Sequence, residues 1–319
     1  MDARTLVAAS RFWGRRFTRV VEVRRVANVT LRLAEARPDG GERFRWLRLC
    51  RHPATTGSNL GFELRVLQAV KSGPELAVVR PLAGCRGRLR TRLPWDGAMR
   101  HACLFDAAPG REMLPCPDDV RRFRRALAAL HDALPAARGS PLRRIEAGAS
   151  CHAAASWLRR AGPDAAAIAD DAERAAPVLR SALEAAGPGI GLCHGDARLG
   201  NALLDGECVT FLDFEGCAVG PLALDLATMA VWLRRETKAA ALWSVLLDGY
   251  RSRRVLSSGD LAALPALAAL VEIRMAGSLA RFWTMPPAMW GEMHVRVRAR
   301  LDELGATAGR SGAASPRLP

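Results

Sequence analysis

The sequence predicts an α+β fold with two lobes, a small β-rich N-terminal lobe followed by a larger helical C-terminal lobe. The chain has 319 residues, which exceeds one average domain but suits two lobes that share a cleft. Short alternating or β-branched runs fill the first third of the chain, and apolar residues at helical spacing fill the rest. We place the lobes at residues 1–108 and 109–304, followed by a small and polar flexible tail at 305–319.

Five short runs in the first lobe predict strands, because they are apolar or alternating and partly β-branched. They are residues 19–27, 29–34, 43–50, 76–81 and 102–106. Pro38-Asp39-Gly40-Gly41 predicts a turn between the second run and the third. A Gly-x-Gly-x-x-Gly loop after a strand commonly binds phosphates through its backbone, and no such loop separates the first two runs. The backbone of the turn at 27–30 is the candidate for covering phosphates in its place.

Helical spacing begins after Pro109-Gly110, which we interpret as the hinge between the lobes. Asp118-Asp119 opens an apolar stripe, and acidic residues favour the first turn of a helix. Further helical segments are expected at residues 153–160, 164–176, 178–186, 222–233, 236–252, 260–283 and 288–304, with Pro177 at the start of the third. The apolar run 261–271 is interrupted by Pro265, so we expect it to be too short to span a bilayer.

Residues 192–226 hold the most informative pattern of the chain. His194 and Asp196 are followed by Asn201, five residues after the aspartate, and later by Asp213. An Asp, an Asn five residues on and a second Asp on a neighbouring strand have the spacing of a phosphoryl-transfer catalytic loop. A short apolar run at 190–193 predicts the strand that leads into this loop.

The sequence between Asn201 and Asp213 predicts a β-hairpin. Runs 202–204 and 208–212 are apolar, and Asp205-Gly206 between them is a signal for a tight turn. Asn201 precedes the hairpin and Asp213 follows it. We therefore expect their side chains to lie close together.

Each residue type has a separate role in moving a γ-phosphoryl group. An aspartate at position 196 can accept the hydrogen bond and then the proton of a hydroxyl nucleophile. Mg²⁺ prefers oxygen ligands, and Asn201 and Asp213 offer one neutral and one charged oxygen. The metal would neutralise the charge that develops on the phosphate oxygens. The pattern predicts transfer from a nucleoside triphosphate to a hydroxyl group.

The segment resembles the aminoglycoside phosphotransferase, choline kinase and homoserine kinase superfamily, whose members share a protein-kinase-like fold. The family pattern is His-Gly-Asp, then Gly-Asn, then Asp-Phe-Asp/Glu at a strand end, and finally Gly-Pro followed by Asp-Leu. This chain has these elements at 194–196, 200–201, 213–215 and 220–226.

The resemblance implies roles for the residues of the motif. Asp196 corresponds to the catalytic base, and Asn201 and Asp213 correspond to the Mg²⁺ ligands. Asp225 corresponds to a buried carboxylate that holds the backbone of the loop, and His194 supports the loop by packing and hydrogen bonding. The implied cofactor is Mg²⁺, with ATP or GTP as phosphoryl donor.

Two residues beside the motif have two interpretations each. Arg198 stands two residues after Asp196, where the family commonly has His and where protein kinases place a cation on the γ-phosphate. A surface arginine in an arginine-rich chain explains it equally well. Glu215 fits a solvated or structural residue better than a second metal ligand.

An enzyme of this kind needs a cation on its third strand, held by a helix glutamate, to bind the α- and β-phosphates. Neither of the two lysines lies on that strand. Arg48 stands at the position of the family's Leu-Arg or Leu-Lys strand, and Glu63, which we expect to open the next helix, is its natural partner. Arg45 or Arg51 would project from the opposite face of the strand.

The net charge of +15 is unevenly distributed. Residues 1–100 hold 21 basic and 8 acidic side chains, whereas residues 101–319 hold 26 and 24. The excess lies in the lobe that would meet phosphates, and 45 arginines against two lysines also indicate a GC-rich coding bias. No nucleic-acid recognition motif accompanies the charge, so we expect no specific nucleic-acid partner. The charge also argues against a polycationic aminoglycoside acceptor.

The partners expected from the sequence are a nucleoside triphosphate and a small-molecule hydroxyl acceptor. Residues 247–251 resemble the branch of the family that contains homoserine and stress-response kinases, so a protein Ser/Thr kinase of that type is an alternative. A second alternative is a non-catalytic nucleotide- or nucleic-acid-binding protein. The N-terminus lacks the apolar core of a secretory signal, and we expect a cytoplasmic protein with no membrane partner. The acceptor, ATP versus GTP, and the oligomeric state stay open.

Overall fold

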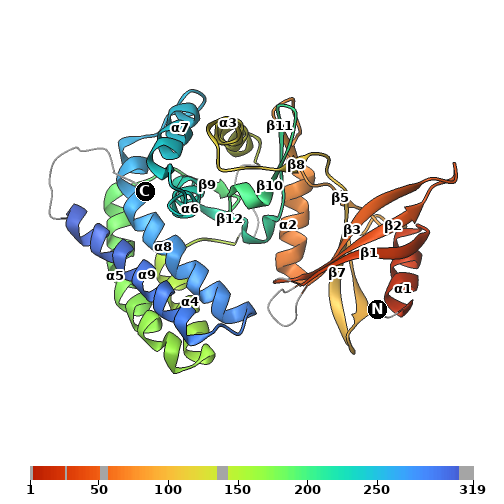
Figure 1. The fold of residues 1–319 in the computed structure, drawn as a ribbon, viewed down its shortest axis with the longest axis horizontal. Coiled ribbons are helices and arrows are strands. Elements are labelled where there is room, and N and C mark those ends of the chain that lie inside the picture. Colours follow the sequence, from red (N-terminus) through yellow and green to blue (C-terminus); the bar gives the residue numbers. More distant parts are fainter. Residues whose placement is uncertain (1–2, 26, 51–56, 135–142, 309–319) are drawn as a thin grey trace.

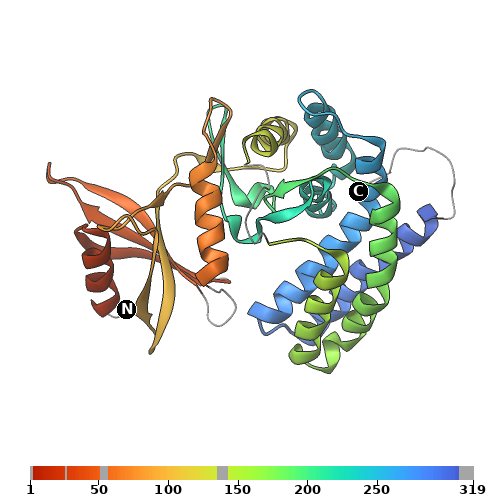
Figure 2. The ribbon, with the colours of Figure 1, turned by 180° about the vertical axis from the view of Figure 1, so that it is seen from behind.

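A computed structural model describes residues 3–25, 27–50, 57–134 and 143–308 of the chain. These residues form an N-terminal part built on an antiparallel sheet and a C-terminal part built mainly from helices, side by side along the long axis of the molecule (Figure 1 and Figure 2). The arrangement confirms the α+β class predicted from the sequence.

The N-terminal sheet has six strands. Its order is β1-β2-β3-β7-β5, with β6 paired to β7 outside that path, and every pairing is antiparallel. The strands are β1 (Phe17–Arg25), β2 (Val29–Ala36), β3 (Glu42–Leu49), β5 (Pro81–Leu82), β6 (Arg90–Trp95) and β7 (Ala98–Asp106). β6 is not among the predicted strands, because Arg90, Arg92 and Pro94 obscure its alternation.

Two helices lie on opposite faces of this sheet (Figure 1). They are α1 (Ala3–Trp13), which the sequence analysis does not predict, and α2 (Gly57–Ala69). Leu47 and Leu49 of β3 share a buried cluster with Trp13 of α1. Because side chains alternate along a strand, Arg48 between these leucines points to the other face, where α2 lies.

A second sheet joins the two parts of the chain. Its order is β4-β11-β10-β8, formed by β4 (Leu76–Val78), β8 (Arg111–Glu112), β10 (Ala202–Asp205) and β11 (Cys208–Phe211). The prediction that residues 76–81 form a strand of the N-terminal sheet is therefore wrong for β4, which pairs in parallel with β11. The hairpin predicted at 202–212 is present, and this sheet is its support.

The C-terminal part contains seven α-helices within the described ranges. They are α3 (Pro117–Ala133), α4 (Ala147–Ala161), α5 (Ala166–Ala186), α6 (Ala223–Leu233), α7 (Ala239–Arg251), α8 (Ser258–Phe282) and α9 (Pro287–Ala308). Pro177 lies inside α5 and does not begin a new helix, although it costs one backbone hydrogen bond. Ala176 and Leu179, on either side of it, are buried in the core that holds α5 in place. Residues 305–308 belong to α9 and not to the expected tail, of which 309–319 lie outside the described residues.

One helix of the described residues, α8, is long and apolar enough to cross a membrane by length and composition. The expectation that its apolar run is too short is wrong, because the helix continues through Pro265 for 25 residues. However, 67% of its most apolar window is buried inside the fold. Its contacts are with α4, α5, α6 and α9, so it packs as the central helix of the C-terminal part.

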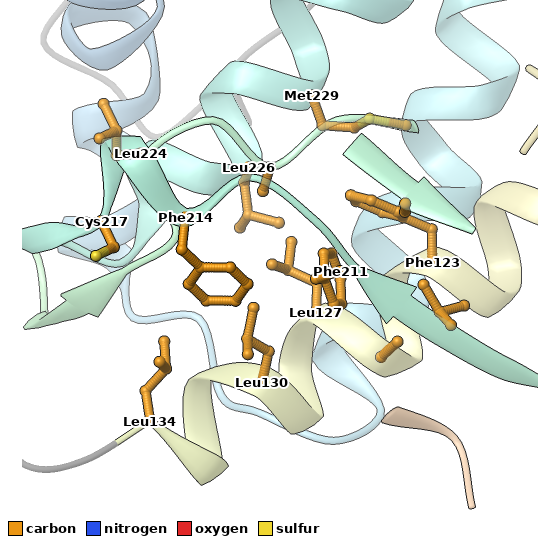
Figure 3. Packing of buried hydrophobic residues seen from close by; sticks show 14 of the residues in the cluster. Phe123, Leu127, Leu130, Leu134, Phe211, Phe214, Cys217, Leu224, Leu226 and Met229 are labelled. Atoms are coloured by element: carbon orange, nitrogen blue, oxygen red, sulfur yellow. The ribbon is translucent and has the colours of Figure 1, made fainter. Parts of the chain in front are cut away.

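A buried apolar cluster packs against the hairpin (Figure 3). Phe123 of α3 meets Phe211 of β11 edge to face, with ring centroids 5.3 Å apart. Leu127 and Leu130 of α3 and Phe214, just after the hairpin, are fully buried in the same cluster. The end of the hairpin therefore rests on a close-packed core.

Candidate active site

The predicted loop leaves β9 (Ile190–Cys193), which pairs antiparallel with β12 (Ala218–Pro221), a strand that the sequence analysis does not predict. Gly195 has a φ of +83°, a conformation that favours glycine. A Cβ at this position would lie 2.1 Å from the carbonyl oxygen of Gly216. Only glycine fits here, which explains on steric grounds why the His-Gly-Asp motif has glycine at position 195.

Asp225 of α6 holds the backbone of this loop from inside the fold. Its fully buried carboxylate accepts the backbone N–H groups of His194 and Gly195, both at 2.8 Å. The Nε2 of His131 lies 3.0 Å from the same carboxylate, and its Nδ1 lies 2.7 Å from the hydroxyl of Tyr250. Burial alone would raise the pKa of Asp225, but the hydrogen bonds from His131 and Gly195 lower it below its usual value.

His194 connects the loop to the hairpin. Its Nδ1 accepts the backbone N–H of Asp196 at 3.3 Å, and its Nε2 donates to the carbonyl oxygen of Leu212 at 2.8 Å. The ring packs on Phe214 with centroids 4.4 Å apart. Both ring nitrogens are used by the backbone, which leaves this histidine in a supporting position.

Asp196 and Asn201 lie in direct contact. The Nδ2 of Asn201 donates to Oδ2 of Asp196 at 2.6 Å and to its backbone carbonyl at 2.9 Å. The Nε of Arg198 lies 3.3 Å from the same Oδ2, and the guanidinium stacks 4.6 Å above the ring of Trp232. Both of these donors use Oδ2, no described residue donates a hydrogen bond to Oδ1 of Asp196, and the side chain is 42% exposed.

The hairpin brings Asp213 to the same place. The backbone N–H of Leu212 donates to the carbonyl oxygen of Asn201 at 2.8 Å, which closes the open end of the hairpin. Asp213 adopts a left-handed conformation with φ of 54°, which is uncommon for a residue other than glycine. Its carboxylate is half exposed and lies 3.7 Å from the guanidinium of Arg48.

Arg48 and Glu63 form a buried ion pair with 2.6 Å between Nη2 and Oε2. Glu63 lies in the middle of α2 and does not open it, contrary to expectation. Burial alone would lower the pKa of Arg48, but the adjacent Glu63 carboxylate raises it well above its usual value. Arg45 projects from the other face and pairs with Glu35 at 2.8 Å, and Arg51 lies outside the described residues.

The donor set fits a hard divalent cation that also binds phosphate. Asn201 uses its amide nitrogen on Asp196, so its oxygen is the atom able to coordinate a metal, and Asp213 adds a half-exposed carboxylate. Within the described ranges, no group of three or more His, Cys, Asp or Glu side chains could hold a metal. Two protein oxygens suit Mg²⁺, which keeps waters and substrate phosphates in its coordination shell.

A contact that sequence reasoning does not predict connects this site to the N-terminal sheet. Asn28, in the turn between β1 and β2, donates from Nδ2 to the Oε2 of Glu215 at 2.7 Å. Glu215 is half-buried and follows Asp213 by two residues. The turn at 27–30, the candidate phosphate cover, therefore lies beside the end of the hairpin.

The chain matches known proteins in sequence. A family model described as the phosphotransferase enzyme family matches residues 31–258. An uncharacterized protein of Deinococcus radiodurans is 32% identical over 265 residues, which span 78% of this chain and 76% of that relative. The match confirms the resemblance that the loop motif indicates.

Solved structures match almost the whole chain. A microcompartment-associated aminopropanol kinase has a TM-score of 0.71 at 21% identity and covers 95% of this chain and 96% of its own. An amicoumacin kinase in complex with AMP-PNP, Ca²⁺ and Ami has a TM-score of 0.74 at 16% identity and covers 94% of each chain. At these identities the likeness shows the fold, and it confirms the protein-kinase-like fold expected from the sequence.

Proposed function

This chain belongs to the phosphotransferase enzyme family, and we propose that it transfers the γ-phosphoryl group of ATP to a hydroxyl group of a small molecule. The observation that carries the proposal is that Asp196, Asn201 and Asp213 meet at the end of one hairpin, within reach of the buried Arg48–Glu63 pair. These are the parts that phosphoryl transfer needs. We assign nucleotide binding to residues 1–108 and acceptor binding to 109–304.

In this proposal Asp196 is the catalytic base. Its Oδ1 accepts the hydrogen bond of the acceptor hydroxyl and aligns the oxygen with the γ-phosphorus, while Asn201 and Arg198 hold Oδ2. The hydroxyl oxygen bonds to phosphorus, the bond from phosphorus to the leaving diphosphate oxygen breaks, and the hydroxyl proton ends on Asp196. The products are the phosphorylated acceptor and ADP.

The remaining residues hold the donor nucleotide and position the loop. Arg48, oriented by Glu63, binds the α- and β-phosphates. Asn201 and Asp213 hold Mg²⁺, which when bound supplies charge neutralisation at the phosphate oxygens. Asp225 and His194 keep the loop in the conformation that presents Asp196.

A small molecule is the acceptor that the comparisons favour. The solved structures with this fold include kinases described as acting on aminopropanol and on amicoumacin, neither of which is a protein. The test is a screen for release of ADP from ATP, or of GDP from GTP, with Mg²⁺ against hydroxylated metabolites, antibiotics and a generic protein substrate. The proposal is supported if the parent protein phosphorylates a small molecule and the Asp196→Asn variant does not. Phosphorylation of only the protein substrate would contradict it.

A further inference from the structure

Three half-buried arginines lie beside the catalytic loop, and we call them the arginine face. Arg143 precedes α4 and donates from Nη1 to the backbone carbonyl of Glu215. Arg274 and Arg281 both lie on α8. Residues seven apart on a helix share one face, two turns and about 10 Å apart. The guanidinium groups of Arg274 and Arg281 therefore lie on the same face of α8, about two turns apart.

The charges of this face act on one another and on the catalytic loop. Arg274 is within electrostatic range of Asp196, Asp225 and Arg143, and burial lowers the pKa of its guanidinium. Arg281 interacts in the same way with Glu215 and Arg143, and burial also lowers its pKa. Three cations thus share a partly desolvated surface next to the reacting groups.

The neighbouring carboxylates are already used by other groups. Asp225 accepts the loop backbone and His131, Asp196 accepts Asn201 and Arg198, and Glu215 accepts Asn28. Within the described part of the chain, neither arginine of α8 has a hydrogen bond or an ion pair.

Arg281 also has a buried Nε without any hydrogen-bond partner. Its guanidinium is 5.2 Å from the ring centroid of Trp157 and 5.0 Å from that of Phe282, which fixes the orientation of its planar group. The three most deeply buried of the described arginines, namely Arg45, Arg48 and Arg300, each have a carboxylate partner. Arg45 pairs with Glu35 and Arg300 with Glu303.

We propose that the arginine face binds an acidic group of the acceptor, so that the substrate is an anionic alcohol and not a cationic one. The proposal rests on the proposed phosphotransferase function. A carboxylate or phosphate group accepts two parallel hydrogen bonds from a guanidinium, and it would supply the direct ion pair that the three arginines do not have with any described residue. The hydroxyl of such a molecule would then point from α8 toward Oδ1 of Asp196.

Binding of matched alcohols tests the proposal. The probes are glycerate and glycerol 3-phosphate as anions, glycerol as the neutral molecule and 3-amino-1,2-propanediol as the cation, each titrated into the protein with Mg²⁺ and ADP. The two anions separate a carboxylate site from a phosphate site. We expect at least one anion to bind about tenfold or more tightly than glycerol, and the cation to bind most weakly.

Arg274→Gln and Arg281→Gln should each weaken anion binding about 10- to 100-fold, the range for a lost charge-assisted hydrogen bond. Arg274→Lys should recover part of the loss. Arg180→Gln is the matched control, because it removes an exposed arginine of α5. Affinity for Mg²⁺ and ADP, measured in the same variants, should not change. Thermal unfolding of each variant verifies that it folds.

Four outcomes would overturn the proposal. They are tighter binding of the cation, no preference for either anion over glycerol, an anion preference that survives in both glutamine variants, and an equal loss of ADP affinity, which would assign the arginines to the nucleotide. Failure of the proposed phosphotransferase function would give a different result from failure of the proposed acid-binding role of the arginine face. In that case the parent protein would not bind ADP with Mg²⁺, while the comparison of anion with neutral alcohol still decides whether the face binds acids.

Discussion

The side-chain amide of Asn201 donates to Oδ2 of Asp196 at 2.6 Å, and this contact assigns the two oxygens of the carboxylate to different tasks. Oδ2 also lies near Nε of Arg198, so it is fixed by two donors. In the proposed mechanism, Oδ1 accepts the hydrogen bond of the acceptor hydroxyl. The same amide orientation turns the oxygen of Asn201 away from Asp196 and leaves it for a metal. In the proposed mechanism, one hydrogen bond thus prepares both the base and a metal ligand.

Asp196→Asn should keep the fold and nucleotide binding but lower turnover by about 10²- to 10⁴-fold, the usual contribution of a general base. Asparagine preserves the shape of the side chain and loses the oxygen that accepts the proton. Steady-state ADP release measures turnover, and calorimetry with Mg²⁺ and ADP measures binding. Turnover near the parent value would remove Asp196 from the mechanism.

Asp213→Ala should abolish the Mg²⁺-dependent part of ATP affinity, because Asn201 alone is a neutral ligand and cannot offset triphosphate charge. Calorimetry with and without Mg²⁺ separates this part from the rest. Asp302→Ala, which removes an exposed carboxylate of α9, is the matched control. Equal metal dependence in the Asp213 variant and the control would disprove the metal assignment.

Elements with strong local patterns could be predicted from the sequence, and elements that depend on distant partners could not. The hairpin from Ala202 to Phe211 has both its apolar runs and its turn signal in ten consecutive residues. Strand β4 has only three residues and pairs with β11, more than 130 positions later, so its sheet could not be read from its own sequence. Pro177 misled the prediction because burial of its neighbours outweighs the lost hydrogen bond.

The same contrast between local patterns and distant partners applies to the residues of the candidate site. The motif residues from His194 to Asp213 lie within 20 positions of one another, and their spacing is itself the signal. Asn28 and Glu215 are 187 positions apart, and His131 and Tyr250 are 119 apart, so no local pattern joins them. The available signal for His131 is its place on the buried face of α3, next to Leu130. A polar side chain there needs a buried partner, which turns out to be Asp225.

Glu63→Gln should destabilise the protein by about 3–5 kcal/mol, because it leaves the buried charge of Arg48 without its counter-charge. Combining Arg48→Met with Glu63→Leu should restore most of the stability, since apolar residues replace both charges, but it should not restore ATP binding. Urea unfolding and calorimetry measure the two effects. If the double variant binds Mg²⁺ and ATP like the parent, the ion pair has no role in nucleotide binding.

Stability should fall in acid through Glu35, a buried carboxylate that accepts hydrogen bonds from Arg15, Arg43 and Arg45. Burial alone would raise the pKa of Glu35, but these bonds lower it from 4.5 to about 2. The unfolded chain therefore binds the proton more readily, so the contribution is complete above about pH 5 and is lost as the pH falls toward 2.

The size of this contribution is roughly 3 kcal/mol at neutral pH. Glu35→Gln should lower stability at pH 7 by an amount of this order and flatten its dependence on pH between 5 and 2. Urea unfolding across that range measures both changes. Glu184→Gln, which removes an exposed carboxylate of α5, should leave the pH profile unchanged. A Glu35 variant with the pH profile of the parent would contradict the assignment.

Tyr250→Phe tests whether the buried chain from Tyr250 through His131 to Asp225 positions the catalytic loop. The hydroxyl lies 2.7 Å from His131, which lies 3.0 Å from the carboxylate that holds the loop backbone. Phenylalanine keeps the buried ring and removes the hydroxyl, which contacts Arg254 as well as His131, at a cost in stability of about 0.5–1.5 kcal/mol. Because small displacements of a catalytic group reduce turnover strongly, we expect kcat to fall about tenfold while the KM for ATP stays the same. A loss of stability without any change in kcat would mean that the chain only holds the fold, and Asp225 would then position the loop without help from Tyr250.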